Sequence, residues 1–436
     1  MTQVLAWVLL LVPAGVFLLM GFRYVVRGTP IRRIRSATRT GEAPGIADER
    51  FPATLELLTH IDFLPGNAAE LFTCGDETYP RMWEDLRNAE RSITLQMYYA
   101  NPGRVADVTQ RILIERARAG VKVLFLRDAF GAGGLPQSYF DAMTDAGVEV
   151  ATFRPIHWYS LERAYARSHI RVVVIDAHVA YTGGFGLDDK WLGDGRSADH
   201  WRDTTVRFTG PSVAHLQATF AAGWADATGQ LLTGSLFFPF DPEQNGDGGT
   251  NTTPMRASVL HAAPTIGSTP AERFLALAIG GATERLWITN AYFVPDLDFV
   301  GLLTHASERG ADVRVLVPSQ LTDSTPVFYA GRETYGPLLA GGVRIYEYVP
   351  TMHHAKTFVA DHDLAGVGTM NFDNRSMAFN DESVFVAYDR DFNERLATIF
   401  EEDLRYAREV TLDDWRRRPW TERVASRVAY MFRRVL

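Results

Sequence analysis

The sequence has very little cysteine and very little lysine. Cys74 is the only cysteine among 436 residues, which excludes a disulfide framework and a zinc site built on several thiolates. Only Lys122, Lys190 and Lys356 are lysines among the 44 basic residues, so a lysine inside a motif is more informative here than an arginine. The formal net charge of −8 argues against a general nucleic-acid-binding protein, whose surface would be basic.

The remaining composition is that of a folded protein. Hydrophobic residues make up 46% of the chain and charged residues 22%. A chain of this length and composition can bury a large core and divide it over two or three domains.

The amino terminus is predicted to be a membrane anchor. Residues 4–22 carry no charge and are about long enough to span a hydrocarbon core as a helix. A secretory signal fits less well, because no positive charge precedes the run and no small-residue cleavage pattern ends it. By the positive-inside rule, the arginines that follow place the rest of the chain on the cytoplasmic side: Arg23, Arg27, Arg32, Arg33 and Arg35.

The carboxyl terminus combines arginines with apolar residues. The apolar residues within 413–436 include Trp415, Trp420, Val424, Val428, Met431, Phe432 and Val435. This pattern is typical of an amphipathic helix at a membrane interface. A terminal helix that docks on the protein and turns a basic face to water would have the same composition.

Two parts of the chain contain similar segments in the same order. The predicted strands are 92–100, 121–126 and 146–153 in the first part, and 285–296, 312–318 and 341–348 in the second. A helix with apolar residues at helical spacing follows the first strand of each part and ends at Gly120 or Gly310. Strands that alternate with helices predict an α/β fold with mainly parallel sheets.

The repeat becomes strict around two histidines. "HIRVVVID" (169–176) aligns without a gap on "HAKTFVAD" (354–361), an offset of 185 residues. The alignment continues from "TGGFGLD" (182–188) to "VGTMNFD" (367–373). A purely structural repeat would need only its apolar positions to match, whereas here a histidine, a cation, an aspartate and a glycine match as well. This excess indicates a reaction centre.

Strand geometry sorts the polar residues of the two motifs. Residues two apart point to the same face, so His169 lies with Arg171 and His354 lies with Lys356. The motif aspartates also count as candidate catalytic residues, but their parity is opposite. We therefore expect Asp176 and Asp361 to orient or end their strands rather than to touch substrate.

Two histidines and two cations that converge about a pseudo-two-fold axis suit a displacement at phosphorus. One imidazole attacks, while the other protonates the leaving oxygen and later deprotonates the acceptor. The cations neutralise the non-bridging phosphate oxygens. This scheme requires no metal and no cofactor. A single His-x-Lys motif would more often contain a core histidine, but two copies in register favour catalysis.

These motifs resemble the HxKxxxxD signature of the phospholipase D superfamily, whose members use duplicated halves. Four further segments resemble its bacterial cardiolipin synthase branch: "HWRDT" (200–204), "TNAYFVPD" (289–296), "GTMNFDNRS" (368–376) and "FNDE" (379–382). The resemblance runs from about residue 70 to the carboxyl terminus. It implies two phospholipase D-like α/β/α sandwich halves related by pseudo-two-fold symmetry. It also implies phosphatidyl transfer between phospholipids, with phosphatidylglycerol as the expected substrate, through a covalent phosphohistidine.

The resemblance also implies roles for individual residues. His169 would be the nucleophile and His354 the general acid and base, although the motifs alone do not fix this assignment. Asp203 and Glu382 match the family's downstream carboxylates, which orient the histidines. The phosphate contacts implied by the match are Lys356, Thr369, Asn371 and Gly184.

The first motif departs from the family pattern at two positions. Arg171 stands where the family has a lysine, and Gly186 where it has an asparagine. Arginine keeps the charge and can bind phosphate with two donors, but it is longer and planar. Glycine removes a side-chain hydrogen bond. The first half-site either retains its function or is degraded, which would leave a catalytically impaired phospholipid-binding protein.

Other interpretations stay open. A soluble phosphodiesterase or nuclease of the same superfamily would share the motifs, but the acidic balance and the predicted anchor disfavour it. A non-catalytic membrane scaffold would not need its histidines. Four aromatic residues form either an interfacial rim or part of the core: Trp158, Tyr159, Trp191 and Trp201. The ratio of transfer to hydrolysis and the oligomeric state are not fixed by the sequence.

The patterns together predict a domain organisation. In chain order it comprises an anchor (1–22), a basic linker (23–50), a first phospholipase D-like half (51–235), a linker (236–270), a second half (271–410) and a basic amphipathic segment (411–436). We expect a protein of the bacterial inner membrane with its catalytic part on the cytoplasmic side.

Overall fold

The computed structural model describes residues 12, 15, 31–34, 44–155, 166–239, 255–265 and 267–434. Most of the predicted anchor at 4–22 therefore lies outside the described residues, as do positions 23, 27 and 35 of the arginine cluster. None of the helices that the described residues form is long and apolar enough to cross a membrane.

The elements of the two halves follow one another in a repeated order. The first-half strands are β1 (Leu64–Phe72), β2 (Ser92–Met97), β3 (Lys122–Asp128), β4 (Glu149–Phe153), β5 (Val172–Ile175), β6 (Val179–Gly183) and β7 (Thr205–Thr209). The second-half strands are β8 (Met255–Ala262), β9 (Arg285–Asn290), β10 (Asp312–Pro318), β11 (Arg344–Tyr348), β12 (Lys356–Ala360), β13 (Leu364–Gly368), β14 (Glu382–Tyr388) and β15 (Ala407–Val410).

Helices separate these strands. Those before and within the first half are α2 (Arg50–Thr59), α3 (Gly75–Arg87), α4 (Arg104–Arg118), α5 (Gln137–Asp145) and α7 (Ser212–Thr228). Those of the second half and the carboxyl terminus are α8 (Pro270–Gly281), α9 (Leu297–Glu308), α10 (Thr325–Ala340), α11 (Asn374–Ala378), α12 (Arg390–Leu404), α13 (Leu412–Arg416) and α14 (Trp420–Met431). The predicted strands and both predicted repeat helices are present within a few residues of their expected bounds.

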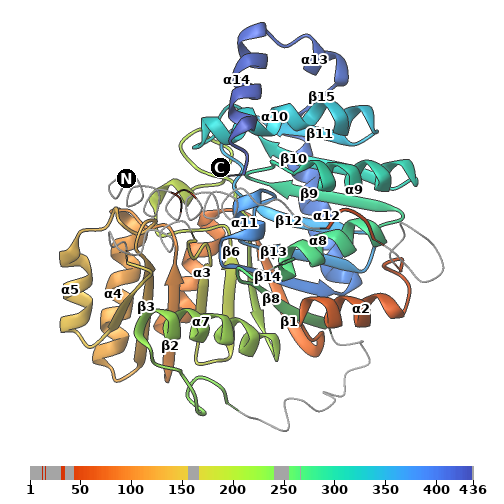
Figure 1. Ribbon diagram of the computed structural model, residues 1–436. Helices are drawn as coiled ribbons and strands as arrows, with labels where there is room; N and C mark the ends of the chain where they lie inside the picture. Colours follow the sequence, from red (N-terminus) through yellow and green to blue (C-terminus); the bar gives the residue numbers. More distant parts are fainter. Residues whose placement is uncertain are drawn as a thin grey trace, which may run out of the picture.

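The strands form one mixed sheet that runs through both halves (Figure 1). Outward from the centre, the first half contributes β1, β7, β6, β5, β2, β3 and β4, and the second contributes β8, β14, β13, β12, β9, β10 and β11. The equivalent strands therefore occupy equivalent places on either side of the β1–β8 pair. This order is the pseudo-two-fold arrangement that the sequence repeat predicted, with β15 added at one edge.

The prediction of mainly parallel sheets is wrong. Only the outer strands of each half are parallel, namely β2 to β4 and β9 to β11. The inner strands pair antiparallel, as β5 does with β6 and β12 does with β13. The reason is the connection: residues 176–178 join β5 to β6, and so short a turn permits a hairpin but no crossover.

Helices cover both faces of the sheet. α3, α4 and α5 pack on one face of the first half, and α8, α9 and α10 pack on the corresponding face of the second. α7 and α12 lie on the other face and share one hydrophobic cluster, in which the Phe208 and Phe385 rings are 4.5 Å apart. This shared cluster fixes the two halves against each other.

Two of the predicted domain boundaries are wrong. α2 was assigned to the first half, but it buries Phe51 and Leu55 in the core of the second half and lies beside α8 in Figure 1. β8 falls inside the predicted linker 236–270, yet it pairs with β1 and β14 at the centre of the sheet. The polar, turn-rich residues before β8 led the sequence interpretation to include it in a linker.

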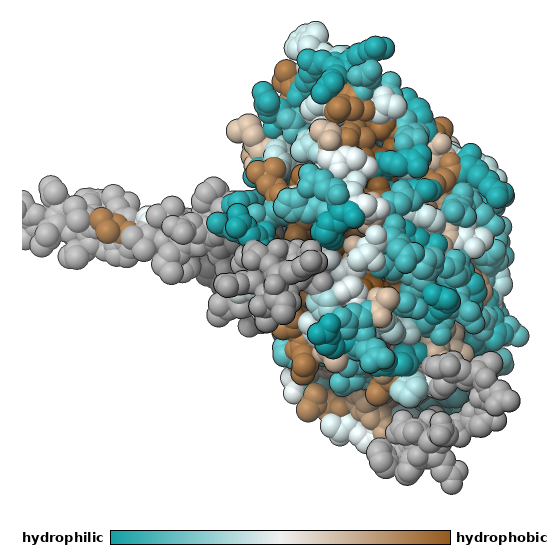
Figure 2. All heavy atoms as spheres, turned by 90° about the vertical axis from the view of Figure 1, so that its right-hand side faces the viewer, coloured by the Kyte–Doolittle hydropathy of each residue, from teal (hydrophilic) through white to brown (hydrophobic). Residues whose placement is uncertain are grey.

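The carboxyl-terminal segment forms α13 and α14, and α14 docks on α10. Ser426 is buried, and Ala429 packs against a small cluster that includes Val327. The outward side of α14 is nevertheless apolar, with exposures of 75% for Trp420, 53% for Val424, 51% for Val428 and 71% for Met431. Brown patches interrupt the hydrophilic surface at the top of Figure 2, at the height of α13 and α14 in Figure 1. The helix is thus docked on the protein and amphipathic on its exposed side.

Candidate active site

The two motif histidines stand just before equivalent strands. His169 precedes β5 and His354 precedes β12. Backbone bridges then cross between the halves, since Ser168 pairs with Asp381 and His353 pairs with Arg202. The His169 amide donates to the Asp381 carbonyl at 3.0 Å, and the His354 amide donates to the Arg202 carbonyl at 2.6 Å. Each half therefore holds the start of the other half's motif.

Each histidine is held by a carboxylate of the opposite half. His169 Nδ1 lies 3.0 Å from both Glu382 oxygens, and His354 Nδ1 lies 2.9 Å from Asp203 Oδ2. All four side chains are buried. Because Nδ1 of each ring faces its carboxylate, Nε2 is the nitrogen that can react with substrate, and at His354 it lies 2.9 Å from Lys356 Nζ. Neither half alone contains a complete histidine–carboxylate pair.

Burial sets the charge of both imidazoles. It lowers the pKa of His354 to about 3, assisted by the Lys356 ammonium, and burial with Arg171 and Lys356 lowers the pKa of His169 well below its usual range. Both rings are therefore neutral at pH 7 and donate from Nδ1 to their carboxylates. A neutral imidazole keeps the lone pair on Nε2 that a nucleophile or a base requires.

The two carboxylates differ in charge. Burial alone would raise the pKa of Asp203, but the hydrogen bond from His354 and the nearby Lys356 hold it well below the usual range. Burial raises the pKa of Glu382 to about 7, although Ser376 and Thr369 donate hydrogen bonds to its carboxylate. The site therefore has a firmly ionised carboxylate behind His354 and one that is half-protonated near pH 7 behind His169.

The motif cations lie against the histidines. Arg171 donates from Nη1 to the His169 carbonyl at 2.8 Å, and its guanidinium faces the ring of Tyr98. Lys356 Nζ lies 2.9 Å from His354 Nε2 and 2.5 Å from the His354 carbonyl, and burial lowers its pKa to about 7. Arg171 lines the cavity, whereas Lys356 sits behind His354.

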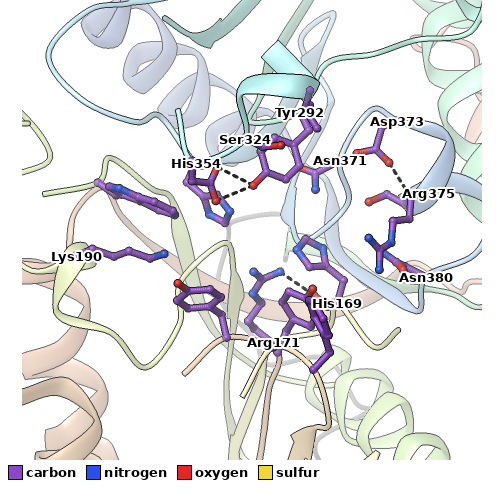
Figure 3. A pocket seen from close by; sticks show the side chains of 18 of the residues that line it. His169, Arg171, Lys190, Tyr292, Ser324, His354, Asn371, Asp373, Arg375 and Asn380 are labelled. Carbon is purple, nitrogen blue, oxygen red and sulfur yellow. Dashed lines mark hydrogen bonds between the residues drawn. The ribbon is translucent and has the colours of Figure 1, made fainter. Parts of the chain in front are cut away.

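The histidines face one cavity of about 510 Å³ between the halves, a volume typical of small-ligand pockets. Figure 3 shows the labelled side chains of His169, Arg171, Lys190 and His354 converging on it. Aromatic rings make up much of its wall: Tyr98, Tyr99, Trp191, Trp201 and Tyr292. The cavity thus combines basic groups with an apolar lining.

Two of the four aromatic residues singled out in the sequence lie in the described part of the chain. Trp191 and Trp201 line the cavity and pack on His354, with ring centroids 5.5 and 5.2 Å from the imidazole. Trp191 also belongs to the hydrophobic core of the first half and Trp201 packs against that core, so both rings are at once core and cavity wall. Trp158 and Tyr159 lie outside the described residues.

The motif aspartates, which the sequence counted among the candidate catalytic residues, do not line the cavity. Asp176 follows the far end of β5 and accepts hydrogen bonds from the amides of residues 90, 91 and 92. Asp361 follows the far end of β12 and accepts from the amides of residues 283, 284 and 285. Both residues have positive φ, 55° and 44°, where the chain turns out of the strand. They end their strands, as the opposite parity predicted.

Two of the four implied phosphate contacts are engaged elsewhere. The Thr369 hydroxyl donates to Glu382 at 2.5 Å, and Gly184 leaves room for Asp203, whose carboxylate oxygens lie 2.4 and 2.5 Å from where a Cβ would be. Neither residue lines the cavity. Asn371 does line it, is 3% exposed, and has no hydrogen-bond partner for Oδ1 among the described residues. Of the four implied phosphate contacts, Asn371 is thus the one that lines this cavity.

The sequence interpretation missed several cavity residues. Lys190 and Arg375 line the cavity and correspond to each other at the same offset of 185 residues. Tyr99 and Tyr292 follow the equivalent strands β2 and β9. The repeat alignment carried the signal for the first pair, because it extends past residue 188 without a gap. The second pair required the positions of strand ends, which the sequence gives only within a few residues.

Comparison with known proteins places this geometry in a family. A model of the family described as "Cardiolipin synthase, PLD-like domain" matches residues 275–404. Cardiolipin synthase of Geobacillus kaustophilus is 33% identical over 399 residues, covering 89% of this chain and 78% of that protein. Cardiolipin synthase A of Pseudomonas syringae is 31% identical over 381 residues, covering 87% and 77%. The chain belongs to the cardiolipin synthase branch of the phospholipase D superfamily. The resemblance stated from the motifs is confirmed.

The fold of this cardiolipin synthase relative also matches solved structures. The crystal structure of phosphatidylserine synthase from Haemophilus influenzae superimposes with a TM-score of 0.64 at 14% identity, covering 89% of this chain and 98% of that one. Polyphosphate kinase from Porphyromonas gingivalis gives a TM-score of 0.53 at 13% identity, covering 84% and 53%. At these identities the likeness concerns the fold alone.

One departure of this family member from the pattern has a visible structural counterpart. A Cβ at Gly186 would lie 2.9 Å from the Trp191 ring and 2.8 Å from the Tyr99 carbonyl. Trp191 therefore fills the space of the missing asparagine, and its indole N–H donates to Asp203 at 2.8 Å. The first half-site is packed and hydrogen-bonded in a different way, which argues against degradation.

Proposed function

We propose that this chain transfers a phosphatidyl group from one phosphatidylglycerol molecule to the headgroup hydroxyl of a second, forming cardiolipin and releasing glycerol. One observation carries the proposal: two buried neutral histidines face a single cavity, and each is oriented by a carboxylate of the opposite half. This arrangement suits a double displacement, in which one group forms a covalent bond and the other moves protons.

In the first step, His169 Nε2 attacks the phosphorus of the donor. The bond from phosphorus to the headgroup oxygen breaks. His354, which takes up a proton on Nε2 when the anionic donor enters the cavity, delivers that proton to the leaving oxygen, so glycerol leaves. The choice of His169 as the nucleophile and His354 as the acid follows from the charge of the carboxylate behind each ring. Ionised Asp203 stabilises the imidazolium form of His354, whereas Glu382, with its pKa raised to about 7, favours a neutral His169.

The cations and amides of the cavity would bind the phosphodiester during both steps. Arg171 and Lys356 lie against the two histidines and would neutralise the non-bridging oxygens as the transition state forms. Asn371 offers a side-chain amide to the same group. Arginine in place of lysine at position 171 keeps the charge, and its contact with the His169 carbonyl aims it at the nucleophile.

The test is an assay of the purified full-length chain on phosphatidylglycerol in vesicles or detergent micelles. We expect cardiolipin and glycerol to form in equal amounts, with phosphatidic acid measured in the same reaction as the product of hydrolysis. Binding of phosphatidylglycerol without any product would contradict the proposal and favour a lipid-binding protein. Phosphatidic acid without cardiolipin would indicate a hydrolase.

We further propose that the chain works at a bacterial inner membrane, with residues 4–22 as an anchor and α14 lying in the interface. The exposed apolar residues of α14 stand beside exposed Arg423 and Arg427, which suits an anionic bilayer. The helix also adjoins the cavity: Ala429 packs near Val327 and Tyr292, both of which line it. Seating α14 in lipid would bring the cavity to the headgroups.

The helix can be tested with single cysteines, after Cys74→Ser, in the full chain reconstituted into vesicles that contain phosphatidylglycerol. A polarity-sensitive label on Val424→Cys or Val428→Cys is expected to report a lipid environment. The same label on Thr398→Cys, an exposed position of α12, serves as the control and should remain in water. Labels at 424 and 428 that report water, as at 398, would refute the docking of α14.

A further inference from the structure

Lys190 brings a positive charge into the cavity that no neighbouring acid neutralises. Its Nζ lies 3.6 Å from the ring centroid of Trp201 and 3.7 Å from that of Tyr99, so two aromatic faces hold it in place. Within the described part of the chain, no carboxylate lies close enough to form an ion pair with it. Figure 3 shows its side chain directed into the cavity. A cation held this way is ready to bind an anion.

The reacting phosphodiester does not need this cation. A phosphodiester carries a single negative charge, and Arg171 and Lys356 already stand against the two histidines. Lys190 makes its ring contacts farther along the aromatic wall, with Tyr99, Trp191 and Trp201. Arg171, Lys190 and Arg375 line the cavity against the two acids Asp323 and Asp373, and burial raises the pKa of Asp373 to about 7. The cavity wall therefore carries more basic groups than ionised acids.

We propose that Lys190 binds the phosphodiester of the acceptor lipid. The inference rests on the proposed function, in which the acceptor is itself a phospholipid and the product leaves with two phosphodiesters. Water and simple alcohols carry no such group. Lys190 would thus select a phospholipid hydroxyl over water as the acceptor.

The place of Lys190 agrees with the chemistry of the second step. The acceptor hydroxyl oxygen bonds to phosphorus, His354 Nε2 takes the hydroxyl proton, and the phosphorus–nitrogen bond to His169 breaks, which returns His169 to its neutral form. The acceptor's own phosphodiester is only three carbons from the attacking oxygen, so it must lie on the His354 side. Lys190 is on that side because Trp201 contacts both its ammonium and the His354 ring.

The experiment compares acceptors in one reaction. The full chain is given phosphatidylglycerol micelles with added ethanol, and cardiolipin, phosphatidylethanol and phosphatidic acid are measured together. Lys190→Met removes the charge at similar length, and Lys190→Arg retains it. Lys122→Met is the matched control, because Lys122 is an exposed lysine of β3 that pairs with Glu149 outside the cavity.

Lys190→Met is expected to lower the ratio of cardiolipin to phosphatidylethanol about 10- to 100-fold, the size of one lost hydrogen bond to a charged group. Lys190→Arg should restore most of the ratio, and Lys122→Met should match the wild type. An unchanged ratio, whether all products fall together or none falls, would overturn the inference. Failure of the proposed function is seen separately, as a wild-type protein that makes no cardiolipin.

Discussion

His169→Ala is expected to lower the rate of cardiolipin formation by a factor of about 10⁴ or more, because the nucleophile that forms the covalent intermediate is lost. His354→Ala is expected to cause a similar loss with phosphatidylglycerol, whose leaving oxygen needs a proton. The two variants should differ on a nitrophenyl phosphodiester, whose leaving group departs without protonation. There His354→Ala should release nitrophenol in a single burst, whereas His169→Ala should release none.

His353 provides the matched control for these variants. It is the sequence neighbour of His354 and is equally buried, but its Nε2 contacts Asp403 at 3.0 Å and its ring does not line the cavity. His353→Gln keeps a hydrogen-bonding side chain there and should retain a rate within a few-fold of the wild type. Cardiolipin formation by His169→Ala at a comparable rate would refute the covalent mechanism.

Asp203→Asn and Glu382→Gln are both expected to reduce the rate by about 10² to 10⁴. An amide in place of either carboxylate can donate to Nδ1, which moves the ring proton to Nε2, the nitrogen that has to attack or accept a proton. Each substitution acts on the histidine of the opposite half. Rates measured on phosphatidylglycerol with lipid binding measured in parallel separate this loss from a loss of substrate affinity.

The same two substitutions are expected to change stability in opposite directions at pH 8. Burial raises the pKa of Glu382 from 4.5 to about 7, so the folded chain loses stability as the pH rises through this range. Glu382→Gln removes that loss, at most about 3 kcal/mol, and should raise the free energy of unfolding at pH 8 but not at pH 4. The pKa of Asp203 is lowered instead, so its carboxylate contributes stability above the unfolded value, and Asp203→Asn should be less stable at pH 8.

Chemical denaturation of the three proteins at pH 4 and pH 8 measures these differences. The wild type is the reference at each pH. A Glu382→Gln protein that is less stable than the wild type by the same amount at both values would contradict the raised pKa of Glu382.

Local patterns in the sequence were enough to predict the duplicated halves and the histidine motifs. The alignment of residues 169–176 on 354–361 fixed both histidines, and strand parity separated them from Asp176 and Asp361. Those features depend on period-two alternation and on spacing within a few residues, which a single sequence records directly.

The partners across the halves could not be predicted from local patterns. Asp203 lies 151 residues before His354, and Glu382 lies 213 residues after His169, so only the backbone bridges of the folded chain decide which carboxylate meets which ring. The departure at Gly186 is similar. The sequence shows a missing asparagine there, but only packing shows that Trp191 fills its space and donates to Asp203.

The order of the strands in the sheet could not be predicted from local sequence patterns either. β8 follows a polar, turn-rich stretch, and only its pairing with β1 and β14 identifies it as a central strand. The sequence shows that lysine is rare but does not show that Lys190 lies in the cavity. Its partners are the rings of Tyr99 and Trp201 rather than a charged residue, and such contacts leave no local pattern.

The central claim is that the two halves build one site in which His169 carries the phosphatidyl group. Its most direct test is rapid quenching in alkali, which preserves phosphohistidine, after mixing the full chain with phosphatidylglycerol, followed by mass spectrometry of the peptides. We predict one phosphatidyl adduct, on the peptide that contains His169, absent from His169→Ala and accumulating in His354→Ala with a nitrophenyl phosphodiester. An adduct on His354, or cardiolipin formation at full rate with no adduct on either histidine, would contradict the account.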